Sequence, residues 1–316
     1  MTGEVERRLR RAAFSALIAL VTLGSVDALG VVAPDTAVPG GTVTVYIPAN
    51  PAIRSAKVGL YDSAGAAVAV MPAFPFTEDP LASGWVAILG VPTTIRPGSY
   101  RIEVRVTGES AIERQSLPIA IAPREFRHEN IHLDQGLTRL QTEKTPVKRA
   151  QAVQLWGILM RFDGAAIYQT GRLTMPVEGY VVTSHFGDRR DYVFTGGGEE
   201  PDIHQGIDFG VPAGTPIHAA GAGRVTFAGS WLMTGNTVII EQLPGVYALY
   251  YHMDRMLVHE DQLVKQGDPI GFVGSTGLAT GPHLHWQIEV GGVAVDPMAL
   301  LSTALIKPSD FLQAPN

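Results

Sequence analysis

Two short fragments of this chain carry side chains that could bind a metal ion. The first runs from His204 to Asp208 (HQGID) and the second from His283 to His285 (HLH), and the chain contains no cysteine. Imidazole nitrogens and carboxylate oxygens suit Zn²⁺, and three protein ligands with an open fourth position make a hydrolytic site. A further imidazole comes from His252. The pattern therefore predicts metal-assisted hydrolysis.

The second fragment has the period of a β-strand. From His283 to Val290 polar and apolar residues alternate, so every second side chain should point to the same face. The polar face would hold His283, His285, Gln287 and Glu289. The two imidazoles then lie roughly 7 Å apart along the strand. One could bind the metal while the other reaches substrate, or both could bind it.

The first fragment should not be helical. Gly206, Gly210 and Pro212 all disfavour a helix at this point. His204 and Asp208 are four residues apart, so they share a face in either kind of secondary structure. Both side chains can therefore approach one ion from the same side.

Seven segments between about Leu173 and Pro297 resemble, in the same order, the lysostaphin/LytM-type zinc metallopeptidases that cut peptidoglycan peptides. They are Thr183–Arg189, His204–Gly210, Gly214–Ala220, Gly221–Val225, Tyr251–Met253, Gly267–Gly271 and Val273–His285. The resemblance covers about two fifths of the chain.

The resemblance implies a role for each of five residues. His204, Asp208 and His285 match the zinc ligands of the family. His252 and His283 match its two active-site histidines that do not bind the metal. The resemblance also implies an antiparallel β domain with an open groove, with the zinc at the bottom and a glycine-rich loop beside it.

The implied activity is hydrolysis of peptide bonds in the stem peptides or cross-bridges of peptidoglycan, by metal-activated water with histidine acid or base assistance. Two other functions are compatible with parts of this pattern. A non-catalytic LytM-like module would activate a separate cell-wall hydrolase, but relatives of that kind typically lack the metal ligands, which are all present here. A structural zinc site would usually have a fourth protein ligand, often cysteine.

Arg189 and Tyr192 are two further candidates. The planar guanidinium of Arg189 could bind a substrate carboxylate or brace a loop, and bracing is favoured. Some members of the family carry a tyrosine shortly before the first ligand. Residues 199–203 contain none, whereas Tyr192 lies further back and could reach the site. Three other histidines match no catalytic position and are expected at the surface or in packing: His185, His218 and His259.

Composition and charge limit the possible functions. The chain has 316 residues, of which 46% are hydrophobic and 17% charged, as in ordinary packed domains. The net charge is −6 and no block of basic residues follows the N-terminal segment, so nucleic-acid binding is not expected. The lack of cysteine excludes thiol catalysis, thiolate zinc sites and disulfides.

Residues 1–28 have the pattern of an export signal. Four arginines between positions 7 and 11 precede an apolar run from Ala12 to Val26, and Val26-Asp27-Ala28 offers small residues for cleavage. The run is short for a membrane span, which needs about 20 residues. We expect an exported protein of the periplasm or cell envelope. A cleaved signal is favoured over an uncleaved anchor in the inner membrane.

Residues 33–123 should form an immunoglobulin-like β-sandwich. Alternating runs at 42–47, 56–61 and 100–106 are separated by turn signals such as Pro97-Gly98. No chemistry is visible in this region. It could dock or regulate through a partner, or it could simply stabilise the protein.

Residues 124–172 should connect the domains and contain one helix. Thr145 could cap this helix, with Pro146 at its first position. Lys148 and Arg149 are expected to be exposed. An apolar stripe should pack on a domain: Val147, Ala150, Leu155, Ile158, Leu159 and Phe162.

The chain as a whole should be mostly β. The antiparallel metallopeptidase domain is expected over residues 173–300, with a hairpin turn at Gly291-Gly292. Residues 301–316 should form an irregular tail.

Overall fold

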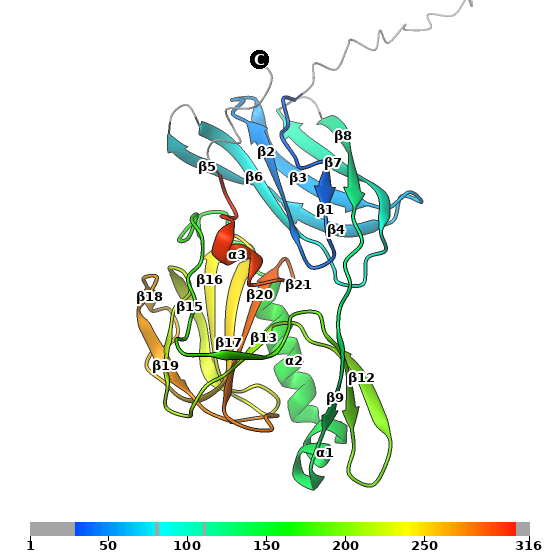
Figure 1. Cartoon of the computed structure of the whole chain (residues 1–316). Helices are drawn as coiled ribbons and strands as arrows, with labels where there is room; N and C mark the ends of the chain where they lie inside the picture. Colours follow the sequence, from blue (N-terminus) through cyan, green and yellow to red (C-terminus); the bar gives the residue numbers. More distant parts are fainter. Residues whose placement is uncertain (1–28, 80–81, 110–111, 308–316) are drawn as a thin grey trace, which may run out of the picture.

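The computed structural model describes residues 29–79, 82–109 and 112–307, which form two β-rich halves joined by a helical connector (Figure 1). The expected export signal, residues 1–28, lies outside the described residues. Within the described ranges, no helix is long and apolar enough to cross a membrane. The element content confirms the predicted mostly β fold class.

Two sheets pack against each other in the N-terminal half. One has five strands in the order β1-β8-β7-β3-β4, and the other has three in the order β2-β6-β5. Their bounds are β1 (Thr36–Ala37), β2 (Thr42–Pro48), β3 (Ile53–Tyr61), β4 (Ala67–Pro72), β5 (Phe74–Asp79), β6 (Ala82–Gly90), β7 (Gly98–Gly108) and β8 (Ile112–Ile121). Val58 and Val104 from one sheet share a core with Val45 and Leu89 from the other. This half is a β-sandwich, and its immunoglobulin-like type stays a prediction.

A ten-stranded sheet forms the C-terminal half. Its main path is β10-β13-β20-β17-β16-β15-β18, with β14, β19 and β21 attached to it. The bounds are β10 (Val181–Ser184), β13 (Ile207–Gly210), β14 (Pro216–His218), β15 (Gly223–Trp231), β16 (Gly235–Leu243), β17 (Val246–Met256), β18 (Leu263–Val264), β19 (Pro269–Val273), β20 (His283–Val290) and β21 (Val293–Val295). Every strand pair in this sheet is antiparallel, as the resemblance implied.

A small third sheet lies beside the ten-stranded one. It contains β9 (His128–His132), β11 (Arg189–Val193) and β12 (Glu199–Ile203) in the order β12-β11-β9. β9 belongs to the connector and runs parallel to β11, whereas β12 is antiparallel to β11. Two helices follow β9, α1 (Gln135–Thr142) and α2 (Pro146–Leu159) (Figure 1). The connector therefore supplies a strand as well as helices.

The two faces of β20 differ as its alternation predicted. Leu284 and Trp286 lie in the main core of the C-terminal half. His285 faces the other way, where the ring of Tyr251 from β17 stacks on it with centroids 5.1 Å apart. Tyr251 belongs to a smaller core that the end of α2 also joins. The polar face of β20 is thus the face toward the connector.

The start of α2 confirms the predicted cap. Thr145 accepts a hydrogen bond from the backbone N–H of Lys148, and Pro146 is the first helical residue. Lys148 was expected to be exposed but is half-buried. Its ammonium group donates to carbonyl oxygens at the C-terminal end of α1, including that of Glu143 at 2.7 Å. Cationic groups are favoured at a helix C-terminus.

The predicted core stripe is confirmed only toward the end of α2, where Leu155, Ile158 and Leu159 pack on a core, as does Phe162 just after the helix. Only Ile158 and Leu159 are buried along the helix, while Val147 is 52% exposed. The physical reason is that α2 reaches the core of the C-terminal half only through its last turn. Val147 and Ala150, in the first half of the helix, are exposed.

The two halves share a continuous core. Phe74 of the sandwich packs in the same cluster as Ile288 of β20. At the edge of this contact Arg124 donates to Asp296 at 2.5 Å. A shared core and a half-buried ion pair fix the sandwich against the C-terminal half.

The end of the described chain returns to the sandwich. After α3 (Ala299–Ser302), Leu305 and Ile306 are buried. Thr44 donates through Oγ1 to the carbonyl of Leu305 at 3.0 Å, and the backbone N–H of Lys307 donates to the hydroxyl of Tyr46 at 2.8 Å. The tail that was expected to be irregular is therefore packed as far as residue 307.

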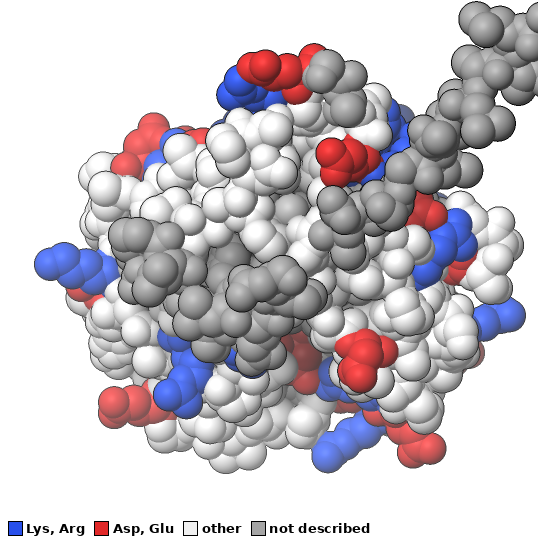
Figure 2. Space-filling model, turned by 90° about the horizontal axis from the view of Figure 1, so that it is seen from above, with Lys and Arg blue, Asp and Glu red and all other residues white. Residues whose placement is uncertain are grey.

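Charged side chains on the sandwich end of the molecule are of both signs. Figure 2 shows acidic and basic residues interspersed among uncharged ones on the described part of this face. A surface of this kind provides no field of one sign that would steer a charged polymer.

Candidate active site

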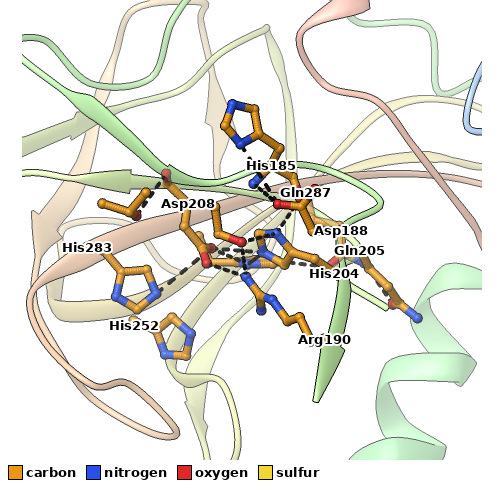
Figure 3. Close-up of polar contacts among 12 residues, drawn as sticks. His185, Asp188, Arg190, His204, Gln205, Asp208, His252, His283 and Gln287 are labelled. Atoms are coloured by element: carbon orange, nitrogen blue, oxygen red, sulfur yellow. Dashed lines mark hydrogen bonds and ion pairs between the residues drawn. The ribbon is translucent and has the colours of Figure 1, made fainter. Parts of the chain in front are cut away.

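Three side chains converge beside the ten-stranded sheet, and two of them, His204 and Asp208, are labelled in Figure 3. His204 Nε2 lies 3.0 Å from Asp208 Oδ1 and 3.0 Å from His285 Nδ1. His285 Nδ1 lies 2.8 Å from Asp208 Oδ1, and all three residues are buried. The structure thus brings together the three residues that were predicted as metal ligands.

Strand register and one glycine place these side chains. Asp208 on β13 pairs directly with His285 on β20. His204 follows β12 and reaches the pair across a turn that contains Gly206. A Cβ atom at Gly206 would lie 2.6 Å from both His285 Nε2 and the carbonyl oxygen of Trp286. Glycine is therefore required for the two fragments to meet this closely.

Hydrogen bonds determine which nitrogen of each imidazole carries the proton. His204 Nδ1 lies 2.9 Å from the carbonyl oxygen of His185, which can only accept, so this nitrogen is the donor. His285 Nε2 lies 3.0 Å from Gln287 Oε1, while the amide nitrogen of Gln287 donates to Glu289 Oε1 at 2.5 Å. His204 Nε2 and His285 Nδ1 consequently turn lone pairs toward the shared carboxylate oxygen.

The three converging atoms fit a zinc ion. Unprotonated acceptors at these distances repel one another unless a cation lies between them. Zinc ligands at about 2.0–2.1 Å in a tetrahedron lie about 3.3 Å apart, close to the 2.8–3.0 Å separations found here. His283 Nε2 is 3.9 Å from Asp208 Oδ1. Of the chain that the structure describes, only these three residues form a group able to hold an ion.

Burial and mutual charge adjust the protonation of these groups. Burial lowers the pKa of His204, although the charge of Asp208 acts in the opposite direction. Burial alone would raise the pKa of Asp208, but its interactions with His204 and His285 hold that pKa well below the usual value. A neutral imidazole and an ionised carboxylate are the forms that bind a metal.

His252 and His283 border the same point and keep one nitrogen free. His252 Nδ1 donates to the carbonyl of Thr276 at 2.8 Å, and His283 Nδ1 donates to that of Gly281 at 2.9 Å. Each Nε2 is therefore an acceptor. Burial and the imidazoles of His283 and His285 lower the pKa of His252 to about 3. His252 also has a φ of 61°, a strained conformation that is frequent at functional sites.

These residues line an open cavity of about 560 Å³. The third sheet contributes Ile131, Tyr192 and Asp202 to its lining, and Met233 comes from the turn between β15 and β16. Residues 280–282, at the end of the glycine-rich segment, also border it. The loop predicted beside the groove is therefore found there.

Sequence patterns did not indicate Arg190, which binds the outer oxygen of Asp208, or Ser184 and Glu129, which bind Arg190. Arg190 Nη2 donates to Asp208 Oδ2 at 2.8 Å, and Arg190 Nε donates to Glu129 Oε1 at 2.6 Å. Burial would lower the pKa of Arg190, but the charge of Asp208 and these hydrogen bonds raise it. The alternation of β11 could have predicted an arginine at the site, because adjacent residues on a strand point to opposite faces and one of arginines 189 and 190 must face it.

Arg189 lies on the other face of β11 and does not line the cavity. Its Nη2 donates to the carbonyl of Thr93 at 2.8 Å, and its guanidinium lies 4.6 Å from the ring centre of Phe126. This placement matches the favoured bracing role, while substrate binding stays a prediction. Tyr192 does line the cavity, and burial raises its pKa, so the hydroxyl stays protonated. The three histidines expected elsewhere lie outside the cavity: His185, His218 and His259.

Comparison with known proteins agrees with this geometry. Residues 202–297 match Peptidase family M23. The DD-carboxypeptidase/endopeptidase Mpg of Neisseria meningitidis serogroup B is 43% identical over 98 residues, covering 31% of this chain and 23% of the relative. The peptidoglycan DD-endopeptidase ShyB of Vibrio cholerae is 38% identical over 117 residues, covering 37% of this chain and 27% of the relative. The chain thus spans about a quarter of the length of these relatives.

A solved structure matches over a longer stretch. The crystal structure of an M23-type protein from Pseudomonas aeruginosa gives a TM-score of 0.57 at 25% identity, covering 85% of this chain and 96% of that one. Coverage of this extent includes much of the sandwich as well as the C-terminal half. Residues 202–297 carry all five of the histidine and aspartate residues that meet at the site. Over this part the chain is thus similar to the peptidases of family M23, which agrees with the resemblance found in the sequence.

Proposed function

We propose that the protein is an exported zinc-dependent endopeptidase that hydrolyses peptide bonds in peptidoglycan. The observation that carries the proposal is the presence of two kinds of imidazole around one cavity. His204 and His285 turn lone pairs toward Asp208, whereas His252 and His283 keep a free Nε2 beside that point. A purely structural metal site does not require imidazoles with a free nitrogen, such as those of His252 and His283, beside the ligands. When bound, zinc supplies the Lewis acidity that polarises a peptide carbonyl and activates water.

His283 is the better placed general base. Its Nε2 lies 3.9 Å from Asp208 Oδ1, the oxygen that faces the ligand nitrogens. Its Nδ1–H is held by the carbonyl of Gly281, so Nε2 points its lone pair at the reaction point. It can take a proton from the attacking water and return it to the leaving amine. His252, kept neutral by burial, and the hydroxyl of Tyr192 are the next groups able to orient substrate.

The cavity suits an extended peptide. Its lining combines apolar side chains, such as Leu133 and Leu278, with the charged and polar groups of the site. The relatives Mpg and ShyB are both named for action on DD bonds, so we place the scissile bond between D-amino acids of a peptidoglycan cross-link. This activity locates the protein in the cell envelope. A docking or regulatory partner for the sandwich stays a prediction.

Digestion of purified sacculi by the full-length protein tests the proposal. Zinc-loaded protein should release peptide-linked fragments that mass spectrometry identifies, a chelator should stop the release, and added zinc should restore it. The variant His283→Ala should keep its zinc and lose about 10²–10⁴-fold in turnover. The variant His204→Ala should lose both zinc and activity.

Each alternative gives a different result. A non-catalytic module would release nothing from sacculi or from defined cross-linked muropeptides, even when fully loaded with zinc. A structural site would hold zinc in wild type and in His283→Ala, again without turnover. Loss of zinc from His283→Ala would instead show that His283 is a ligand and that its role as a base is wrong.

A further inference from the structure

Arg190 is the positive group that faces the proposed metal ligands. Of the described residues that line the cavity, it is the one arginine or lysine. Its Nη2 donates to Asp208 Oδ2 at 2.8 Å and to Ser184 Oγ at 2.6 Å, and its Nε donates to Glu129 Oε1 at 2.6 Å. Ser184 in turn donates to the same oxygen of Glu129 at 2.5 Å. The guanidinium is therefore held on three sides (Figure 3).

The carboxylate of Glu129 completes this network from outside the M23 match. Glu129 lies on β9, in the connector, and its backbone pairs with that of Arg190 on β11. The matched residues are 202–297, so the family segment alone contains neither Glu129 nor Arg190. The sandwich-to-helix connector thus reaches the metal ligands through one ion pair.

Two physical consequences follow from the position of Glu129. A guanidinium beside a cation site repels the cation, and a carboxylate bound to that guanidinium offsets the repulsion. The carboxylate also fixes the orientation of the guanidinium, so that it holds Asp208 Oδ2 and leaves Oδ1 free to converge with the ligand nitrogens. Without it, the guanidinium could turn and compete for Oδ1.

We propose that Glu129 is a positioning residue for the metal centre and acts through Arg190 and Ser184. Its carboxylate keeps Asp208 oriented and keeps the site attractive to a divalent cation. The catalytic side of this inference rests on the proposed function, whereas the effect on zinc binding does not.

The same pair of strands provides a matched control. Side chains alternate along a strand, so the neighbours of Glu129 and Arg190 point away from the cavity. His128 Nε2 of β9 lies 2.9 Å from Asp191 Oδ2 of β11 there. The variant Asp191→Asn removes a carboxylate that joins the same two strands without touching the site.

The experiment measures zinc affinity of the full-length chain by competition with a chromogenic chelator. Glu129→Gln should bind zinc about 10–100-fold more weakly than wild type, the usual effect of losing an outer partner of a metal ligand. Glu129→Asp should recover part of the affinity, and Asp191→Asn should stay within about threefold of wild type. Thermal unfolding of the metal-free proteins reports whether each variant is folded.

Two results would overturn the inference. In one, Glu129→Gln binds zinc as wild type does; in the other, Asp191→Asn weakens zinc binding as much, which assigns the effect to strand pairing. If Glu129→Gln does not fold, Ser184→Ala takes its place, and an unchanged zinc affinity in that variant refutes the network. If zinc affinity responds as expected while wild type cuts no sacculi, the positioning role stands and the proposed function fails.

Discussion

Replacing Glu289 by glutamine should stabilise the metal-free protein at alkaline pH. Glu289 lies on the polar face of β20 and is 3% exposed. Gln287 donates to its Oε1, while its Oε2 has no hydrogen-bond partner among the described residues. Burial therefore raises the pKa of Glu289 to about 7, from an ordinary value of 4.5. The ionised side chain is held in a place that does not solvate its charge.

The sign of the effect follows from the two protonation states. The folded protein binds the Glu289 proton more tightly than the unfolded chain does. The protonated side chain thus contributes stability that is fully present below about pH 4.5 and is lost as pH rises through about 7. A tenfold difference in proton affinity is worth about 1.4 kcal/mol. At pH 8 the ionised group destabilises the fold by about 3 kcal/mol, and at pH 5 by less than about 1 kcal/mol.

Unfolding of chelator-treated protein at pH 5 and pH 8 measures this difference. The chelator is needed because acid releases metal and would add its own effect. Glu289→Gln keeps an acceptor for Gln287 and never ionises. Its Tm should exceed that of wild type by about 5–10 °C at pH 8 and by much less at pH 5. An equal gain at both pH values, or no gain at pH 8, would refute the reasoning.

A second buried glutamate provides the control for this experiment. Glu241 is 1% exposed, but it accepts a hydrogen bond from Arg224 at 2.7 Å. The guanidinium of Arg224 therefore compensates the charge of Glu241, whereas Glu289 has no such partner among the described residues. Glu241→Gln should lose stability at both pH values, which separates the removal of an unpaired charge from the removal of a paired one.

Three further predictions test the site and the packing around it. Gly206→Ala places a Cβ atom 2.6 Å from His285 Nε2 and the carbonyl of Trp286. We expect at least tenfold weaker zinc binding by chelator competition and a loss of about 2 kcal/mol in the free energy of unfolding; wild-type zinc affinity would contradict this. Turnover should fall in acid, because protonation of the His204 imidazole releases zinc, and burial lowers the pKa of His204, so that the fall begins below the ordinary pKa of histidine; undiminished turnover well below about pH 5 would exclude it. Ile306→Ala should destabilise by about 2–4 kcal/mol in urea unfolding, because Ile306 is 1% exposed in the shared core. Leu263→Ala, at a side chain 65% exposed, should change stability by less than about 0.5 kcal/mol.

Features that depend on neighbouring residues could be predicted from the sequence. The alternation from His283 to Val290 assigned each side chain of β20 to its face, because strand geometry fixes that face locally. The turn at Gly291 and Gly292 closes a two-residue hairpin, and both glycines have positive φ, at 58° and 75°. Only glycine adopts such angles easily at both positions. The local chemistry of these segments was sufficient.

Features that depend on the tertiary contacts of a helix or strand could not be predicted in the same way. The apolar residues of α2 indicated a helix that packs on a sheet, yet only Ile158 and Leu159 are buried. Helical periodicity gives the direction of a face but not the length of the surface that covers it. The burial of Leu305 and Ile306 likewise depends on a return to the sandwich, which no local pattern encodes.

The metal centre combines both cases. The ligand residues stand in short motifs, but Glu129, which binds the arginine that holds Asp208, comes from a strand of the connector. A buried arginine beside a carboxylate ligand requires a second carboxylate to balance its charge, so the existence of a partner for Arg190 could have been inferred. Its identity could not, because the register that sets Glu129 opposite Arg190 arises from parallel pairing of β9 with β11. The charge of Arg190 thus predicts a carboxylate partner, and the pairing of β9 with β11 makes Glu129 that partner.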